Sequence, residues 1–132
     1  MINTLLTIGK YINNALTTDS TLTSMIGEKK VYPLIADNDV KFPFLVYKRL
    51  SLQSNTTKDG RHEDEVVVEI SIVSEKYSDG VNIANEVRRI LEKDEVSYSD
   101  IFINEANLIL ASEEYSGNSF LQTMQFQMKV NN

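Results

Sequence analysis

Residues 66–91 read VVVEISIVSEKYSDGVNIANEVRRIL, and this stretch decides the fold class because its hydrophobic period changes partway along. From Val66 to Val73, apolar residues recur at every second position, which is the period of a strand with one buried face. Farther on they recur at helical spacing, and Ser78 or Asp79 can cap the helix. The positions predicted to be buried are Val66, Val68, Ile70 and Ile72 on the strand, and Ile83, Ala84, Val87, Ile90 and Leu91 on the helix.

An earlier strand is predicted to pair with this one as a hairpin. The segment FLVYKRL, from Phe44 to about Leu50, begins just after Pro43, which keeps the preceding residue out of helical space. Pro33 has the same effect in the segment VYPLIA, which we expect to be extended. The connection between the two strands, about residues 52–64, is polar and long for a hairpin. Loops of this length in compact domains tend to be functional or disordered.

Two helices are predicted before the first proline. Residues 2–16 carry apolar side chains at helical spacing, and a shorter helix follows over TTDSTLTSMIG. Asp19 or Ser20 can cap the second helix, and Gly27 can end it in a left-handed turn. The residues predicted to be buried are Ile2, Leu5, Leu6, Ile8, Ile12, Ala15 and Leu16 on the first helix, and Leu22, Met25 and Ile26 on the second.

The C-terminal part is predicted to form a closing hairpin. The segments NLILASEEY and NSFLQTMQFQMKV flank a turn at residues 116–118, whereas residues 94–107 fit no one type of structure. Two hairpins around a helix predict an α+β fold. We expect residues 1–132 to form a single two-layer domain, in which a mostly antiparallel sheet of about four strands carries helices packed on one face.

Composition removes several classes of function. The 132 residues include no cysteine, so disulfides, thiolate metal sites and cysteine nucleophiles are excluded. The formal net charge is −6 and no basic stripe is present, so we expect no specific nucleic-acid binding. No apolar run approaches the roughly 20 residues that span a bilayer, and the N-terminus does not read as a signal peptide, so no membrane association is expected.

No catalytic, cofactor-binding or metal site is predicted. The segment DGRHEDE, residues 59–65, places the one histidine, His62, among carboxylates, which could suggest a metal ion or a general base. A polar loop does not hold ligands rigidly, so a solvated loop is the simpler interpretation. The paired carboxylates Asp94-Glu95 and Glu113-Glu114 are interpreted as solvent-facing charges. The serines and glycines form neither a nucleophile elbow nor a phosphate-binding loop.

What remains is a surface for other proteins. The long polar loop has few residues that could bury enough area to order it alone, so a partner could order it. The open sheet also has edge strands, and unpaired edges invite the addition of another strand. The candidate interface residues are Ser54, Asn55, Thr56, Lys58, Asp59, Arg61 and His62.

The order of these segments resembles the small tail-completion, or tail-terminator, proteins of long-tailed bacteriophages and prophages, which join head to tail. The resemblance covers about residues 5–130, and residues 94–107 carry no marker of the family. Each motif is structural rather than chemical, and their order and spacing carry the resemblance. The motifs are the L-T-x-x-I-G segment LTSMIG, the triplet VYP, the segment FPFLVY and the strand-to-helix unit EISIVSEKYSDGVNIANEVRRIL.

The resemblance implies a virion structural protein and no enzyme, with no cofactor. Such a protein caps the tail tube, ends its polymerisation and offers a face to the head connector. Its partners would be copies of itself in a six-fold ring, the tail tube protein and the head connector protein. The loop at about 52–64 would be an arm at a subunit or tube contact. The protein would lie at the head-proximal end of the tail in the virion, after assembly in the cytoplasm of the bacterial host.

Three alternatives stay open on the sequence. The chain could be another phage neck protein, such as a head-completion or connector subunit, because such families have similar α+β folds. It could be an enzyme or a small-ligand-binding domain, which would need convergent polar groups in a concave apolar site. It could also be a regulatory interaction domain of the host, which would bind a specific host protein.

Overall fold

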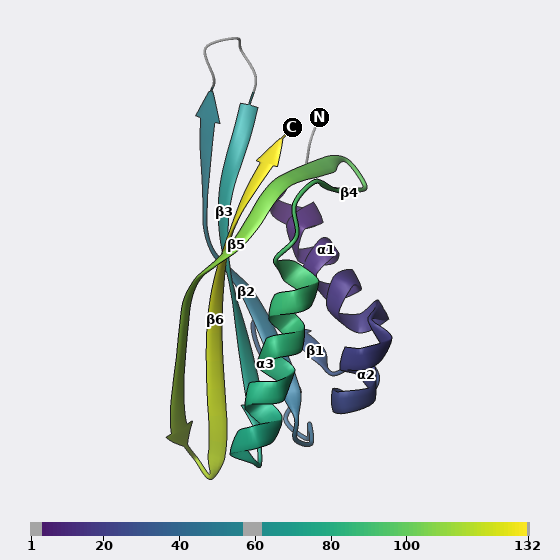
Figure 1. Cartoon of the computed structure of the whole chain (residues 1–132), viewed down its shortest axis with the longest axis vertical. Helices are drawn as coiled ribbons and strands as arrows, with labels where there is room; N and C mark the ends of the chain where they lie inside the picture. The colour runs from purple at the N-terminus through teal and green to yellow at the C-terminus, as the bar shows by residue number, and fades with distance from the viewer. Residues whose placement is uncertain (1–3, 57–61, 132) are drawn as a thin grey trace.

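The structure, a computed structural model, describes residues 4–56 and 62–131 as a mixed sheet with helices packed against it (Figure 1). The helices are α1 (Thr4–Thr18), α2 (Ser20–Ile26) and α3 (Tyr77–Leu91), and the strands are β1 (Val31–Pro33), β2 (Phe44–Thr56), β3 (His62–Ser74), β4 (Val96–Tyr98), β5 (Ile101–Ser116) and β6 (Ser119–Asn131).

Within the described residues, the sheet has six strands in the order β1-β2-β3-β6-β5-β4. Among the strand pairs described, only β1–β2 is parallel, and the other pairs are antiparallel. All three helices cover one face (Figure 1), which confirms the predicted α+β fold with helices on one side. The predicted count of about four strands is wrong. The two additional strands, β1 and β4, have three residues each, which is too short to show a hydrophobic period.

The stretch from β3 to α3 folds as its two periods predict. The even-numbered residues of β3 from Val66 to Ile72 are buried under the helices, and the same face of β6 presents Phe126 and Met128 to the core.

The predicted cap of α3 is wrong, because the helix begins at Tyr77 and its N-cap, Lys76, makes no side-chain capping bond. Neither Ser78 nor Asp79 therefore precedes the helix. The buried side of α3 consists of Gly80, Ile83, Val87, Ile90 and Leu91.

Helix α1 buries a different face from the predicted one at its start. Leu5 and Leu6 are 54% and 53% exposed, whereas Thr4 and Thr7 are buried in their place. The buried stripe continues through Ile8, Tyr11, Ile12 and Leu16 at spacings of three and four, and the two leucines fall off this stripe. Helix α2 follows the prediction except at Met25, which is only partly buried: Asp19 caps the helix, Gly27 ends it with φ at +93°, and Leu22 and Ile26 are buried.

Both hairpins are longer than predicted. β2 continues to Thr56 and β3 begins at His62, so most of the segment expected to be a polar loop at about 52–64 is paired strand, and residues 57–61 lie outside the described residues. Residues 53–56 of β2 are exposed on both faces, so no alternation marks them as a strand. β5 likewise begins at Ile101, inside the stretch that the sequence leaves ambiguous.

The β5–β6 turn lies at Gly117 and Asn118, as predicted. Both residues have positive φ, +58° and +62°, which is the pairing that a tight two-residue hairpin turn requires. This turn and the far end of the β2–β3 hairpin lie at opposite ends of the sheet (Figure 1).

Candidate assembly surfaces

The predicted interface residues are only partly brought together within the described part of the chain. Ser54, Asn55 and Thr56 are exposed at the end of β2, where they pair with the first residues of β3, and His62 lies opposite Thr56. The other three predicted residues, Lys58, Asp59 and Arg61, lie outside the described residues. The described ends of these two strands form an arm, residues 52–56 and 62–64, that the body of the sheet supports through β3 and β6.

Two strand edges in the described chain are left open by the short outer strands. β1 pairs with β2 only at Leu45–Tyr47, so residues 48–56 of β2, here called the β2 edge, have a neighbouring strand on one side only. β4 pairs with β5 only at Ile101–Ile103, and Glu92 accepts a hydrogen bond from the backbone N–H of Leu108. Residues 110–116 of β5, here called the β5 edge, are therefore paired only with β6. Open edges of this kind are templates for another strand.

The large exposed hydrophobic side chains of the described residues gather beside these two edges. Near the β1–β2 side, the ring of Phe42 stacks on Phe44, and Arg49 donates a hydrogen bond to the backbone carbonyl of Leu5. Near the β5 side, the hydroxyl of Tyr77 reaches Glu113. Exposed apolar residues in clusters mark surfaces for other proteins. They are Leu5, Leu6, Leu34, Ile35, Phe42 and Leu50 on the β1–β2 side, and Tyr77, Ile109, Leu110 and Tyr115 on the β5 side.

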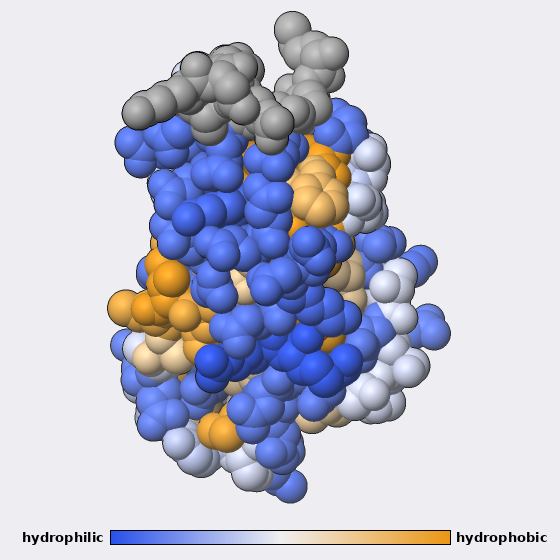
Figure 2. Space-filling model, turned by 45° about the horizontal axis from the view of Figure 1, so that its top comes forward, coloured by the Kyte–Doolittle hydropathy of each residue, from blue (hydrophilic) through white to orange (hydrophobic). Residues whose placement is uncertain are grey.

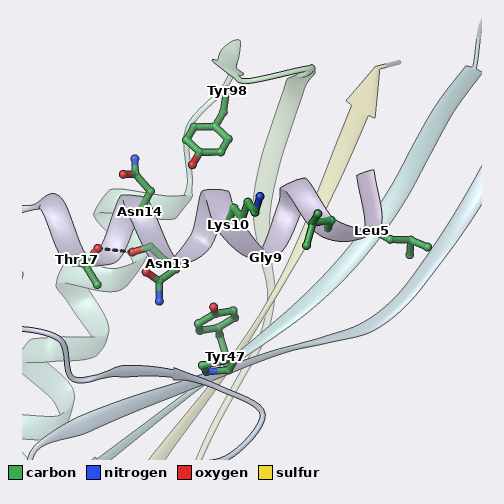
Figure 3. Close-up of a pocket in the computed structure, with 10 residues that line it drawn as sticks. Leu5, Gly9, Lys10, Asn13, Asn14, Thr17, Tyr47 and Tyr98 are labelled. Atoms are coloured by element: carbon green, nitrogen blue, oxygen red, sulfur yellow. Dashed lines mark hydrogen bonds between the residues drawn. The ribbon is translucent and has the colours of Figure 1, made fainter. Parts of the chain in front are cut away.

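An open groove of about 570 Å³ lies along α1 on the β1–β2 side (Figure 3). Tyr47 and Tyr98 flank the helix from opposite sides, and Leu5 and Lys10 lie farther along it (Figure 3). Two of its polar residues bond within the fold, since Asn13 donates from Nδ2 to the carbonyl of Val31 and accepts at its backbone carbonyl from the hydroxyl of Thr17. In the described chain, no buried side-chain nitrogen or oxygen lacks a partner. The groove therefore offers an apolar rim rather than convergent groups for chemistry.

A cluster of aromatic and polar side chains lies on the β5 side at the start of α3. The hydroxyl of Tyr77 donates to Oε2 of Glu113 at 2.9 Å, and Nε2 of Gln122 donates to the same oxygen at 3.0 Å. The ring of Phe120 packs against Tyr77 and Tyr115, with centroids 5.8 and 4.8 Å away. The bonds from Gln122 and Tyr77 lower the pKa of Glu113, and the bond to Glu113 raises the pKa of Tyr77. Glu113 is thus held as a carboxylate at this edge.

The open face of the sheet carries charged and polar cross-strand pairs, and Phe44, Val46 and Val73 also lie on it. Lys48 lies 3.7 Å from Glu69, which accepts from Gln125, and Lys129 lies 3.2 Å from Glu105. The bond and the charge of Glu105 raise the pKa of Lys129. The view in Figure 2 shows a surface that is mostly hydrophilic, with hydrophobic residues in separate patches.

A metal centre finds no support in the described part of the chain, where no three His, Cys, Asp or Glu side chains are grouped for an ion. Two carboxylates instead bond within the fold: Glu113, from one of the pairs noted in the sequence, bonds Tyr77 and Gln122, and Glu92 accepts from the Leu108 amide, which lowers the pKa of Glu92. None of the described helices combines the length and the apolar character needed to cross a membrane.

Comparison with known proteins assigns the chain to a family. The model of the family "Tail completion protein gp17" matches residues 10–130. A chain in a solved structure described as "Virion of native gene transfer agent (GTA) particle" has the same fold, with a TM-score of 0.75 over 92% of each chain at 13% sequence identity. No curated protein matches the chain significantly. The family is one of phage virion structural proteins and not of enzymes. This chain therefore belongs to the tail completion protein gp17 family and is a phage tail structural protein, as the resemblance in its sequence indicates.

Proposed function

We propose that this protein caps the phage tail tube, ends its polymerisation and provides the interface to which the head is joined. The observation that carries the proposal is the placement of exposed hydrophobic residues at two opposite sides of one sheet. Two different surfaces on one subunit produce a head-to-tail contact, and such a contact closes into a ring when the rotation per subunit allows it. A closed ring limits its own growth, which a terminator requires.

The assembled form is a six-fold ring at the head-proximal end of the tail, formed from subunits made in the host cytoplasm. One side of the ring binds the tail tube protein and the other binds the head connector protein. The arm, residues 52–56 and 62–64, is suited to a contact outside the subunit, because it extends along the sheet past the helices (Figure 1). Its exposed residues Ser54, Asn55 and Thr56 offer hydrogen-bonding groups rather than apolar area.

The test is tube growth in the presence of the protein. Purified tail tube protein is polymerised with and without it, and tube lengths are measured by negative-stain electron microscopy. We expect shorter tubes of uniform length, with a ring at one end only, and we expect capped tubes to bind tail-less heads. Tubes that grow as long as in its absence, without end binding, would overturn the proposal. Binding to tail-less heads alone would identify a head-completion or connector subunit instead.

A variant with a shortened arm tests where the contact lies. Replacing residues 55–63 by Asn-Gly joins Ser54 to Asp64, which already face each other, through a two-residue turn. We expect circular dichroism and the melting temperature to stay near those of the wild type, while capping or joining is lost. Full activity of this variant would exclude the arm from the contact.

A further inference from the structure

We infer that neighbouring copies in the ring join by antiparallel pairing of the β2 edge of one copy with the β5 edge of the next. The inference rests on the proposed ring and adds the interface that would close it. The partner is a second copy of this chain, because both edges belong to every copy and their charges are complementary. The β2 edge begins with Lys48 and Arg49, whereas the β5 edge contains Glu113 and Glu114.

The strand directions allow this pairing. Each of the four long strands, in the order β2-β3-β6-β5, runs antiparallel to the next. β2 and β5 therefore run in opposite directions within one copy. If the next copy is placed beside β5 by rotation, its β2 is antiparallel to that β5, and the alternation continues from copy to copy.

One register satisfies both charge pairs and both faces of the sheet. Placing Arg49 opposite Glu113 of the next copy puts Lys48 opposite Glu114, because antiparallel pairing keeps the sum of the two residue numbers constant. Arg49 and Glu113 both project to the helix side, since Arg49 contacts Leu5 in α1 and Glu113 contacts Tyr77 in α3. Lys48 lies on the open face beside Glu69, and Glu114 has the opposite parity to Glu113. Opposite charges thus face each other twice.

The stagger of this register suits a closed sheet. Arg49 of β2 pairs with Val68 of β3, which pairs with Phe126 of β6, whereas Glu113 of β5 pairs with Gln122 of β6. Pairing Arg49 with Glu113 of the next copy therefore shifts the strand register by four residues, counted along β6, from one copy to the next. Four residues span about 13 Å, and the four strand spacings of one copy span about 19 Å. The strands would therefore tilt by about 35° from the ring axis, which lies at the lower end of the range seen in closed sheets.

The same register brings exposed hydrophobic residues together. Beyond the charge pairs, Leu50, at the register irregularity between Arg49 and Ser51, would lie opposite Ser112 of the neighbour, two residues from the exposed Leu110. In the other direction, the end of the neighbour's β5–β6 hairpin, with Tyr115, would reach β1 and the turn after it, where Leu34 and Ile35 are exposed. Strand pairing between the copies would stop at Tyr47, because the backbone N–H of Leu34 donates to the carbonyl of Tyr47 and closes the β2 edge there. Burial of these side chains would add to the strand pairing.

Charge reversal tests the pairing. We expect K48E/R49E and E113K/E114K each to reduce the ring-association constant by about tenfold or more, because each sets like charges opposite one another. Combining all four substitutions in one chain restores the complementarity, so ring formation should recover. R88E, which reverses one exposed charge on α3, is the control and should assemble as the wild type does. Native mass spectrometry over a concentration range, in the presence of short tail tubes, gives the fraction of rings, and circular dichroism checks the fold.

Hydrogen exchange adds a readout that does not depend on substitutions. The backbone amides at 48–53 and 110–114 that face outward should exchange more slowly in the ring than in the monomer. Rings that form equally well in every variant, with no new protection at these amides, would overturn the edge pairing and leave the proposed capping function intact. A wild-type chain that neither forms rings nor caps tubes would overturn both proposals.

Discussion

Nη2 of Arg89 donates to both carboxylate oxygens of Asp19 at 2.8 Å, and this contact ties the start of α2 to the last turn of α3. Oδ1 of Asp19 also accepts from the backbone N–H of Leu22 at 3.0 Å, so one side chain is both cap and bridge. We expect Asp19→Ala to lower the free energy of unfolding by about 1 kcal/mol, because both roles are lost. Asp19→Asn keeps an acceptor for the cap and should have a smaller effect. Urea unfolding followed by circular dichroism measures both; equal losses would show that the cap contributes nothing.

The carboxylate of Asp19 also makes the free energy of unfolding depend on pH. The Leu22 amide, and then Arg89, hold the pKa of Asp19 below its ordinary value of 3.8. Because the folded state binds this proton less readily than the unfolded state, the contribution is complete above the ordinary pKa and is lost as pH falls through the lowered one. We expect the stability difference between wild type and Asp19→Asn to shrink below about pH 4. Urea unfolding at several pH values measures this, and parallel curves would contradict it. Other carboxylates with lowered pKa, such as Glu92, are common to both proteins and cancel in the comparison.

The close approach of α3 to the sheet explains why a glycine occupies position 80. A Cβ atom there would lie 2.7 Å from Oγ of Ser74, a side chain that is fully buried and donates to the carbonyl of Lys76 at 2.8 Å. We expect Gly80→Ala to destabilise the fold by about 1–3 kcal/mol despite the higher helix propensity of alanine. In Ser74→Ala/Gly80→Ala the clashing oxygen is gone, and Cβ of residue 74 lies at an ordinary 3.7 Å.

The double variant should therefore lose less unfolding free energy than the two single variants lose together. Thermal unfolding of the wild type and the three variants gives the coupling free energy between positions 74 and 80. Gly9→Ala is the matched control, because Gly9 is also helical but has no atom within 4 Å of the added Cβ. It should stabilise the protein by about 0.5–1 kcal/mol. Additive effects at positions 74 and 80 would show that the helix shifts to accept the methyl group.

The elements that the sequence predicts are those with one solvent-exposed face and one buried face. β3 and α3 alternate or repeat clearly because each packs a single face on the core, and their periods predict the buried residues except at Ala84, which is only partly buried, and at Gly80, which is buried but not predicted to be. The end of β2 is exposed on both faces, and β1 and β4 are too short, so backbone pairing rather than side-chain burial defines them. Leu5 and Leu6 mislead for another reason, because they are apolar but lie at the surface.

The candidate surfaces depend on strand order, which no local pattern contains. The charge pairs Lys48-Arg49 and Glu113-Glu114 are plain in the sequence, yet only the order β1-β2-β3-β6-β5-β4 places them on opposite edges of one sheet. The polar arm is predictable as a hydrophilic stretch, whereas its length as paired strand depends on the register with β3. Local signals therefore find the residues, and the topology gives them a shared role.

The turn after β1 offers a way to separate assembly from stability. Leu34 and Ile35 are 74% and 77% exposed, so replacing both by serine removes little buried area and should change the free energy of unfolding by less than about 0.5 kcal/mol. If this turn contacts the next subunit, the double variant should form fewer rings at tube ends at equal concentration, as measured by native mass spectrometry. Leu45→Ala is the contrasting variant, because Leu45 is fully buried beside this turn and its truncation should reduce stability by about 2–5 kcal/mol. Normal ring formation by the serine variant would place the contact elsewhere, and a large loss of stability would show that the two side chains are buried in solution.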